Sequence, residues 1–391
     1  MVLTYASLFS GCGGFDLGFS QAGFECVGAF DSDPAAIAVL QRNLPPTASV
    51  CDLTHTAPVL KSPPDVLLAG APCQGFSTVG KRDVDDPRNS LLVLAGHLGV
   101  AIRPKVFIAE NVVGVVAGQH KRYWDALRTI LSSGGYQVNE FCCDASDMGV
   151  PQRRRRMLMI GSRLGRTIEL NLAAVPGGGV SDALKGVRGA PNHLPVPLPE
   201  SSDSFKIARR IGQGQKLCNV RSGIRSVHTW EIPEVFGRTS LRERSLLEAL
   251  LKLRRRNRSR DFGDADPVSA HTLAAFLRCE VTGEIESLVR KGYLRAKADA
   301  VDLTHTFNGK YRRLLATSPS PTVDTRFGDP RYFLHPTKHR GLTVREAARL
   351  QGFPDSFVFE GPEKAQYRMI GNAVPPPMAK MIAGAVRTVL S

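Results

Sequence analysis

The stretch LTYASLFSGCGGFDLGFSQAG, residues 3–23, decides the fold class of this 391-residue chain. It starts with an apolar run at Leu3–Phe9, passes through glycine-rich Ser10–Gly14 and continues as a helical segment to about Gly23. A strand, a glycine loop and a helix in this order open a parallel α/β sheet. Such a loop lets the backbone approach a ligand closely, although a tight structural turn explains the same glycines equally well.

Strands and helices alternate as far as about residue 165. The sequence predicts strands at Cys26–Phe30, Asp65–Ala69, Lys105–Ala109, Tyr136–Cys142 and Met157–Ile160, and helices at Pro34–Arg42 and Tyr123–Leu131. The pattern predicts a doubly wound, mostly parallel α/β sheet that binds ligands beyond the carboxyl ends of its strands. The glycine loop departs from the dinucleotide fingerprint, because Asp16 occupies the third glycine position. Asp31 follows the second strand, where a carboxylate can accept hydrogen bonds from ribose hydroxyls.

The net charge of +15 is concentrated in the middle of the chain. Residues 151–260 carry 23 basic and 8 acidic side chains, whereas the balance is −4 over residues 1–150 and +4 over residues 261–391. A local excess of this kind favours a polyanionic partner over a merely solvated basic surface. Composition alone leaves DNA, RNA and an anionic membrane open as that partner.

Composition also narrows the class of protein. No run reaches the roughly 18–20 apolar residues of a membrane span, which predicts a cytoplasmic protein. The eight cysteines include no CxxC pair, so the sequence predicts no metal site.

One cysteine lies where a reactive thiol is expected. Cys73 belongs to the segment GAPCQGFS, residues 70–77, directly after the strand at 65–69. Loop amides and nearby arginines can lower the pKa of such a thiol and make it nucleophilic. The alternative, an inert buried thiol, fits Cys26 or Cys142 better.

Charged residues are expected at the same edge of the sheet. Glu110 ends another strand, and a partly desolvated carboxyl group there can hold a proton near neutral pH. In the extended segment 152–156, alternate side chains share a face, so Arg154 and Arg156 can meet one anionic or carbonyl group.

The regular alternation stops after residue 165. A helix at Leu241–Leu253 runs into the basic segment Arg254–Arg260, which is either a solvated helix end or a phosphate contact. A helix at Glu284–Lys291 and a turn at Asn308-Gly309 give a helix followed by a hairpin, which resembles a winged-helix module.

Seven segments of the chain, in the family's order, resemble the signature blocks of bacterial DNA (cytosine-5) methyltransferases. These blocks are SLFSGCGGFDLGF (7–19), GAPCQGFS (70–77), ENV (110–112), QRRRR (152–156), SPSPTVDTR (318–326), REAARLQGFP (345–354) and YRMIGNAVPPPMA (367–379). The resemblance covers nearly the whole chain except about 165–310, where the family places its variable target-recognition region.

The resemblance implies a role for each matching residue. Cys73 would add to C6 of cytosine, and C5 would then take a methyl group from S-adenosyl-L-methionine. Glu110 would contact N3 and the exocyclic amine, while Arg154 and Arg156 would hold the base carbonyl or the cysteine loop. The implied cofactor-binding residues are Phe9, Gly11, Gly13, Gly14, Asp31, Asp52, Leu53 and Asn372. Ser32 stands where the family often has a larger apolar residue, which leaves the packing against adenine open.

The resemblance also implies an organisation and partners. We expect a catalytic domain at residues 1–165 plus 360–391, and a small domain at 166–359 with its target-recognition region at about 200–312. The expected partner is double-stranded DNA, met by a monomeric enzyme that flips the target base, with a cognate restriction endonuclease in the same system. We expect the enzyme to be associated with the nucleoid.

Two alternatives were weighed against this interpretation. A tRNA-modifying branch shares the architecture, but GAPCQGFS is more similar to the DNA-acting members. A DNA-binding regulator without catalysis is disfavoured by the intact set of Cys73, Glu110 and residues 152–156.

Overall fold

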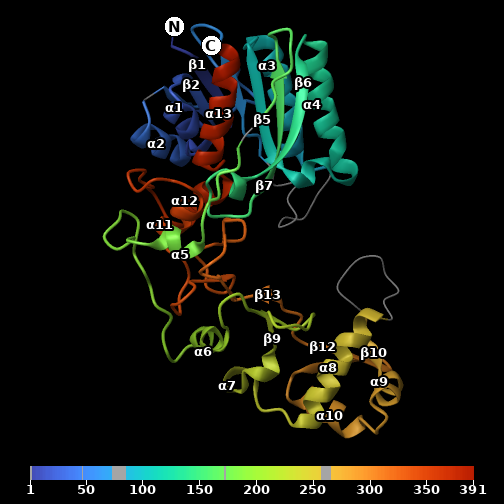
Figure 1. Ribbon diagram of the computed structural model, residues 1–391. Coiled ribbons are helices and arrows are strands. Elements are labelled where there is room, and N and C mark those ends of the chain that lie inside the picture. Colours follow the sequence, from blue (N-terminus) through green and yellow to red (C-terminus); the bar gives the residue numbers. More distant parts are fainter. Residues whose placement is uncertain (1, 46, 73–84, 171–172, 257–265) are drawn as a thin grey trace. The chain divides into compact units, whose positions relative to one another are not determined.

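The computed structural model describes residues 2–45, 47–72, 85–170, 173–256 and 266–391 (Figure 1). The chain divides into two compact units: unit 1 comprises Met1–Leu194, Thr317–Arg326 and Thr343–Ser391, and unit 2 comprises Pro195–Ala316 and Phe327–Leu342. These limits differ from the expected domain boundaries, because residues 166–194 and 343–359 pack with unit 1. None of the helices within the described ranges is long and apolar enough to cross a membrane.

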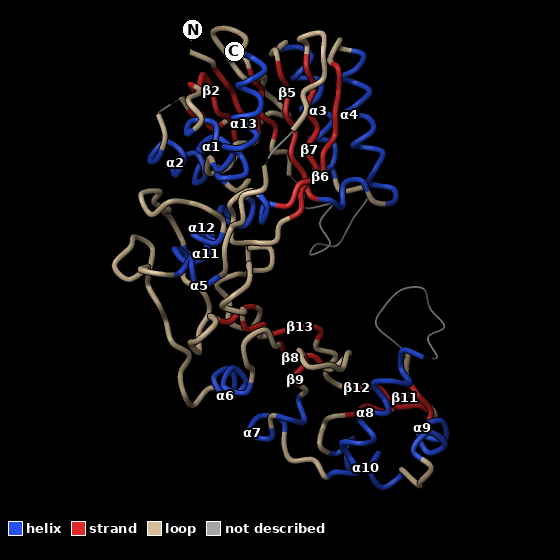
Figure 2. Tube along the Cα trace, viewed as in Figure 1, coloured by secondary structure: helices blue, strands red, loops and turns tan. Residues whose placement is uncertain are grey.

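Unit 1 is built on a seven-stranded sheet in the order β3-β2-β1-β4-β5-β7-β6 (Figure 2). Its strands are β1 Thr4–Leu8, β2 Glu25–Asp31, β3 Ala48–Val50, β4 Val66–Ala69, β5 Val106–Val112, β6 Gln137–Asp144 and β7 Arg155–Ser162. The strands from β3 to β5 pair in parallel, and β7 runs antiparallel to β5 and β6. The predicted α/β class with a mostly parallel sheet is therefore confirmed.

Helices cover both faces of this sheet. They are α1 Gly14–Gln21, α2 Pro34–Asn43, α3 Ser90–Ile102, α4 Lys121–Ser133 and α13 Pro376–Leu390. Unit 1 also contains α5 Val180–Leu184, α11 Val344–Leu350 and α12 Glu363–Asn372, of which α11 packs against the other two. On one face, Phe19 of α1 and Ile382 of α13 join the buried cluster around Ile108. On the other face, the cluster includes Leu92 of α3 and Trp124 of α4. Short 3₁₀ turns lie at Pro87–Asn89, Val113–Val116, Gly118–His120, Ala145–Asp147 and Thr229–Glu231.

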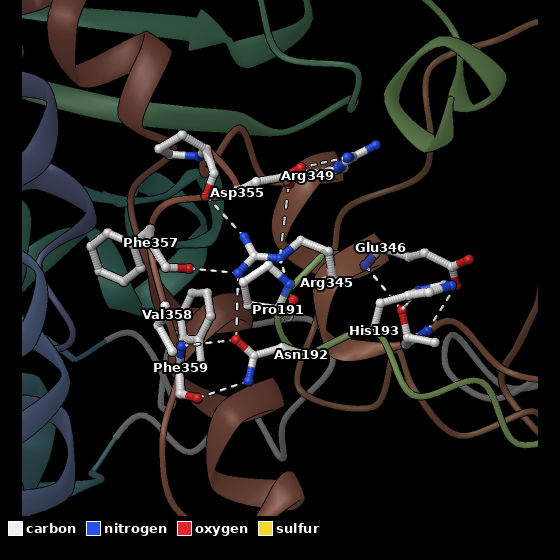
Figure 3. A network of polar contacts seen from close by, with 12 residues as sticks. Pro191, Asn192, His193, Arg345, Glu346, Arg349, Asp355, Phe357, Val358 and Phe359 are labelled. Atoms are coloured by element: carbon white, nitrogen blue, oxygen red, sulfur yellow. Dashed lines mark hydrogen bonds and ion pairs between the residues drawn. The ribbon is translucent and has the colours of Figure 1, made fainter. Parts of the chain in front are cut away.

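A buried arginine of α11 ties the late segments of unit 1 together (Figure 3). The fully buried Arg345 donates hydrogen bonds to the carbonyl oxygens of Pro191 (2.7 Å), Pro354 (2.8 Å) and Phe357 (2.6 Å). Asn192 extends the network, since its amide group pairs with the backbone of Phe359 in both directions. The helix itself begins with a reciprocal capping box between Thr343 and Glu346.

The described residues of unit 2 form helices and three small sheets of short strands. Its helices are α6 Asp203–Arg210, α7 Pro233–Phe236, α8 Leu241–Arg256, α9 Ala270–Leu277 and α10 Thr282–Arg290. Its strands are β8 Lys216–Cys218, β9 Ser226–Val227, β10 Val268–Ser269, β11 Leu294–Lys297, β12 Ala300–Leu303, β13 Asn308–Lys310, β14 Arg312–Arg313 and β15 Phe333–Leu334. Their sheet orders are β10-β12-β11, β13-β8-β9 and β14-β15.

The expected hairpin turn at Asn308-Gly309 was wrong. The hairpin is formed by β11 and β12, and its turn contains Ala298 at φ 50°. Gly309 instead lies inside β13, where its φ of 99° accompanies a register shift against β8. The Asn-Gly pair therefore supplies the positive φ of a bulge, a conformation that glycine adopts at low cost.

Candidate active site

A cavity of about 260 Å³ opens at the carboxyl edge of the sheet in unit 1. Its wall includes the residues that follow β1, β2 and β4, together with Glu110 near the end of β5. This is the edge at which ligands bind in open α/β sheets. Of the predicted site residues, those in the cavity wall are Phe9, Gly11, Asp31, Asp52, Leu53, Glu110, Arg154, Arg156 and Asn372.

The glycine loop is fastened to the end of β2. The Gly11 amide donates a 2.8 Å hydrogen bond to Asp31 Oδ2, and the Asp33 amide donates one of 2.8 Å to Asp31 Oδ1. Gly11 has a φ of 55°, and a Cβ there would meet no atom within 4 Å, so its backbone faces open space. Phe9 also has a φ of 55°, which is uncommon for a residue with a side chain and marks a constrained position. Burial raises the pKa of Asp31.

Two of the expected cofactor residues do not line the cavity. Gly13 begins α1 at φ 89°, and a Cβ there would lie 3.0 Å from the Leu40 side chain. A Cβ at Gly14 would lie 2.4 Å from the Val374 carbonyl oxygen, closer than atoms can approach. These glycines are therefore needed for close packing of α1 against its neighbours.

The far side of the cavity joins a short loop to a late segment. Asp52 Oδ1 accepts hydrogen bonds from the hydroxyl (2.6 Å) and amide (3.0 Å) of Thr54, which lower the pKa of Asp52. Leu53 is buried and adds apolar surface beside it. Asn372, 320 positions later in the chain, ends α12 at the same cavity.

Glu110 and Arg156 form a buried ion pair at the cavity. Arg156 Nε lies 2.8 Å from Glu110 Oε1, and each residue is only 8 % exposed. The two residues lie on the neighbouring antiparallel strands β5 and β7. The contact with Arg156 Nε is not aligned as a hydrogen bond, so Arg156 holds this oxygen by charge, and the carboxylate keeps capacity to accept further hydrogen bonds.

Arg154 shares the inward face with Arg156, as the alternation predicted, but its partners are backbone carbonyls. Its guanidinium donates to the carbonyl oxygens of Val323 (3.1 Å), Gly371 (3.0 Å) and Ala373 (3.0 Å). Gln152, two residues earlier, accepts from the Val323 amide at 2.7 Å and donates to Gln351 at 2.6 Å. These bonds hold segments far apart in sequence around the cavity.

Ser10 and Asp16 are among the cavity-wall residues that the sequence analysis did not assign to the site. Ser10 Oγ and Asp16 Oδ2 are buried and receive no hydrogen bond from the described part of the chain. Ser7 Oγ donates to Asp16 Oδ1 at 2.5 Å, whereas burial raises the pKa of Asp16 to about 6. The signal was present in the sequence, since an acidic residue in an apolar helix is unusual.

The expected nucleophile Cys73 lies outside the described residues. Among the described thiols near the cavity, Cys12 is buried, and burial raises its pKa to about 12. Cys12 is therefore a protonated, unreactive thiol at neutral pH. Burial also raises the pKa of Cys26, while Cys142 is exposed on the edge strand β6, contrary to the buried position considered for it.

Comparisons with known proteins agree with this architecture. The structure is similar to that of a DNA modification methyltransferase from a prophage of E. coli, with a TM-score of 0.59, 24% identity and 99% of each chain covered. It is also similar to the Entamoeba histolytica methyltransferase EhMeth, with a TM-score of 0.56, 14% identity and coverage of 100% of this chain and 99% of that one. At these identities the likeness concerns the fold.

Relatives that are similar in sequence match nearly the whole chain. The chain is 31% identical over 395 residues to the type II methyltransferase M.XorII of Xanthomonas oryzae pv. oryzae, covering 98% of this chain and 84% of that protein. It is 29% identical over 433 residues to M.HgiBI of Herpetosiphon aurantiacus, covering 98% and 97%. Residues 3–388 match the family described as C-5 cytosine-specific DNA methylase. The chain belongs to this family and is a DNA (cytosine-5) methyltransferase.

Proposed function

We propose that the cavity of unit 1 holds S-adenosyl-L-methionine and the target cytosine, and that unit 2 holds double-stranded DNA at the recognised sequence. The observation that carries this proposal is the buried Glu110–Arg156 pair, which lines the same cavity as the Gly11–Asp31 loop. One cavity thus offers a site for a nucleoside cofactor next to a site for a pyrimidine.

The residues present fit the cofactor chemically. The acidic side chains of Asp16, Asp31 and Asp52 line the cavity, which suits a ligand with a positive charge and ribose hydroxyls. The free oxygens of Ser10 and Asp16 can meet polar groups of such a ligand. Phe9 and Leu53 add apolar surface for a flat base. When bound, S-adenosyl-L-methionine would supply the methyl group.

The chemistry of cytosine explains the need for a thiol. C5 of cytosine is not nucleophilic, so the ring must first be activated covalently. In the proposed mechanism the Cys73 thiolate forms a bond to C6, which makes C5 electron-rich enough to accept a methyl group. Loss of the C5 proton then restores the ring double bond as the bond between C6 and Cys73 breaks. A base can reach this site only after it leaves the duplex stack.

Glu110 and Arg156 have complementary tasks in this proposal. The carboxylate of Glu110 would bind the exocyclic amine or N3 of cytosine, offsetting the charge that develops as the ring is attacked. Arg156 holds the carboxylate in place and lies near enough to the cavity to meet the base carbonyl. The backbone contacts of Arg154 support a positioning role for it.

The names of the relatives support the proposal that this enzyme has a partner endonuclease. M.XorII and M.HgiBI are named type II methyltransferases, so we propose a cognate restriction endonuclease that cuts the sequence protected by this enzyme. We propose that the enzyme acts as a monomer on the nucleoid in the cytoplasm.

Bisulfite sequencing of genomic DNA from cells that express the chain tests the function and reports the methylated sequence. We expect methylated cytosines within one short sequence, and none with the variant Cys73→Ala. A duplex with 5-fluorocytosine at the target should trap a covalent adduct with the parent enzyme only, because fluorine at C5 cannot leave as a proton does. Methyl transfer to tRNA without transfer to duplex DNA would overturn the proposal.

A further inference from the structure

Residues 241–256 and 266–303 of unit 2 form a winged-helix module. The elements follow the order α8, β10, α9, α10, β11, β12, and the strands pair antiparallel in the order β10-β12-β11. The helices α8, α9 and α10 gather around β10 and β12 in Figure 1. The segment Arg278–Val281 connects α9 to α10, with Arg278 in the left-handed conformation (φ 56°). Two helices joined by so short a turn, followed by a β-hairpin, make a helix-turn-helix with a wing.

The module has a core of its own. Leucines of α8 pack with Leu273 of α9, Leu288 of α10 and Val301 of β12. Because this cluster draws on all three helices and the hairpin, it fixes their mutual orientation.

Two ion pairs at this core neutralise the buried charges of Glu243 and Arg254. Glu243 of α8 accepts from Lys291 Nζ at 2.7 Å, and Arg254 of α8 lies 2.8 Å from Asp302 of β12. Burial favours the neutral form of Glu243, but the bonds from Lys291 and neighbouring serines prevail and lower its pKa to about 2. Arg254, which opens the basic run at 254–260, is thus part of the scaffold.

One face of α10 carries polar side chains that the scaffold does not use. Thr282, Glu286, Val289 and Arg290 are all exposed, and positions 282, 286 and 289–290 share one side of a helix. Neither Glu286 nor Arg290 has an ion-pair partner among the described residues, although other charges of the module are paired.

These side chains match the groups that base pairs present in the major groove. A glutamate accepts a hydrogen bond from the cytosine amine, an arginine donates two to guanine, and an apolar side chain contacts the thymine methyl group. In helix-turn-helix proteins the second helix enters the groove, and α10 is the second helix here. Arg278 in the turn and Lys297 at the tip of the hairpin are exposed cations on either side of α10 in the chain, suited to phosphates.

We propose that α10 is the reading helix of this enzyme, with Glu286 and Arg290 selecting at least one G·C pair of the recognised sequence. The inference rests on the proposed function of unit 2 and names the residues that would carry its specificity.

Selection of bound duplexes from a random library by the full-length enzyme tests this role by binding alone. The variants are Glu286→Gln and Arg290→Gln, and their matched controls are Glu248→Gln and Lys252→Gln, exposed on α8. We expect the reading variants to lose preference at one or two base pairs by about 10- to 100-fold, the usual worth of a base contact. The controls should select the parent sequence.

The outcomes separate this inference from the proposed function. Unchanged base preference in both reading variants would overturn the inference, and it is also the result expected if the module serves a protein partner. Equal weakening toward all sequences would overturn base reading as well, since it assigns α10 to the backbone. An enzyme that selects one sequence through α10 but never methylates it contradicts only the proposed function.

Discussion

The carboxylate of Glu110 has two roles in this enzyme, since it pairs with Arg156 and lines the cavity. Its ion pair with Arg156 keeps a buried charge near the end of β5, at the wall of the cavity. A partner that holds the carboxylate without occupying all of its lone pairs leaves a preorganised acceptor for the substrate.

Replacing Glu110 with Gln should lower kcat/KM for methyl transfer by about 10²- to 10⁴-fold, because the amide carries no charge to offset that of the attacked ring. DNA affinity should change little, whereas thermal stability should fall, because the buried Arg156 loses its charged partner. Steady-state transfer of labelled methyl groups to duplex DNA measures the effect. The control is Glu140→Gln on β6, which breaks the pair between Glu140 and Arg128 of α4. Equal activity of both variants would contradict the assigned role.

Asp16 is the residue whose titration should be visible in stability. Burial raises its pKa to about 6 in the folded protein, from an ordinary value of 3.8. The folded state therefore holds the proton more tightly than the unfolded state does. This contribution to stability is fully present below about pH 3.8 and is lost as the pH rises through about 6.

In urea unfolding of the cofactor-free enzyme, the parent protein should lose stability relative to Asp16→Asn between about pH 3 and pH 7. The expected change in the difference is about 3 kcal/mol, from 1.36 kcal/mol per pKa unit. The control Ser133→Ala, which changes an exposed uncharged side chain on α4, should show the same pH dependence as the parent. A constant gap between the parent and Asp16→Asn across this range would refute the expectation.

Single residues were predictable where their role is local. The glycine loop and Asp31 lie within 21 positions of each other, and their hydrogen bond follows from two adjacent parallel strands. The partners of Arg154 come from Val323, Gly371 and Ala373, at least 169 positions away. No spacing rule connects segments so far apart. The sequence therefore predicted which face of the strand Arg154 shares with Arg156, but it did not predict the carbonyl groups that Arg154 binds.

At the scale of elements, α11 is held by one buried cation. Arg345 supplies donors to three backbone carbonyls, and burial lowers its pKa. The segment that it holds includes Phe353, whose ring would contact a Cβ at Gly14. The α11 segment thereby supports the start of α1 and the glycine loop next to it.

Arg345→Met should lower the free energy of unfolding by roughly 3–5 kcal/mol, because several buried carbonyl groups lose their donors at once. Chemical denaturation followed by circular dichroism measures the loss. Lys364→Met, an exposed cation-to-methionine change on the neighbouring α12, serves as the control and should shift stability by less than about 0.5 kcal/mol. Similar stabilities for the two variants would rule out the support that we assign to Arg345.

Some elements could be predicted from sequence and others could not, for physical reasons. Strands β1, β2, β4 and β5 could be predicted because each is a short, largely apolar run that ends at a loop. Helix α3 was missed because its sequence, SLLVLAGHLGVAI, is apolar on most sides and contains two glycines. The hairpin turn was misplaced because Asn-Gly is the stronger local signal, yet packing of β11 against β12 decided the register.

At the scale of the whole molecule, the central charge excess should govern affinity for DNA. Affinity should fall by about 10³-fold between 50 and 200 mM salt when six or more phosphates are contacted. Binding of S-adenosyl-L-methionine should be nearly independent of salt. Fluorescence titration of a labelled duplex measures the slope, and Arg221→Gln, an exposed cation of unit 2, should reduce it by about one. An affinity unaffected by salt would contradict a phosphate-binding role for this charge.

The fold class was predictable from the alternation of strands and helices as far as about residue 165, and the charge indicated a polyanionic partner without identifying it. The limits of the two units were only partly predictable: residues 360–391 were expected to return to the catalytic domain, whereas the inclusion of 317–326 and 343–359 in unit 1 was not expected. Gln152 explains part of this return, since its side chain binds both Val323 and Gln351.

The pairing of α1 with α13 has a consequence for synthesis of the enzyme. Gly18 of α1 lies so close to Ala379 that an added Cβ would clash at 2.3 Å, and Arg387 donates to the Ala22 carbonyl at 2.7 Å. Helix α1 is thus completed by α13, some 360 residues later. At about 5–20 residues per second, the ribosome needs roughly 20–70 s to supply α13. A nascent chain therefore carries an unfinished glycine loop until α13 has been made.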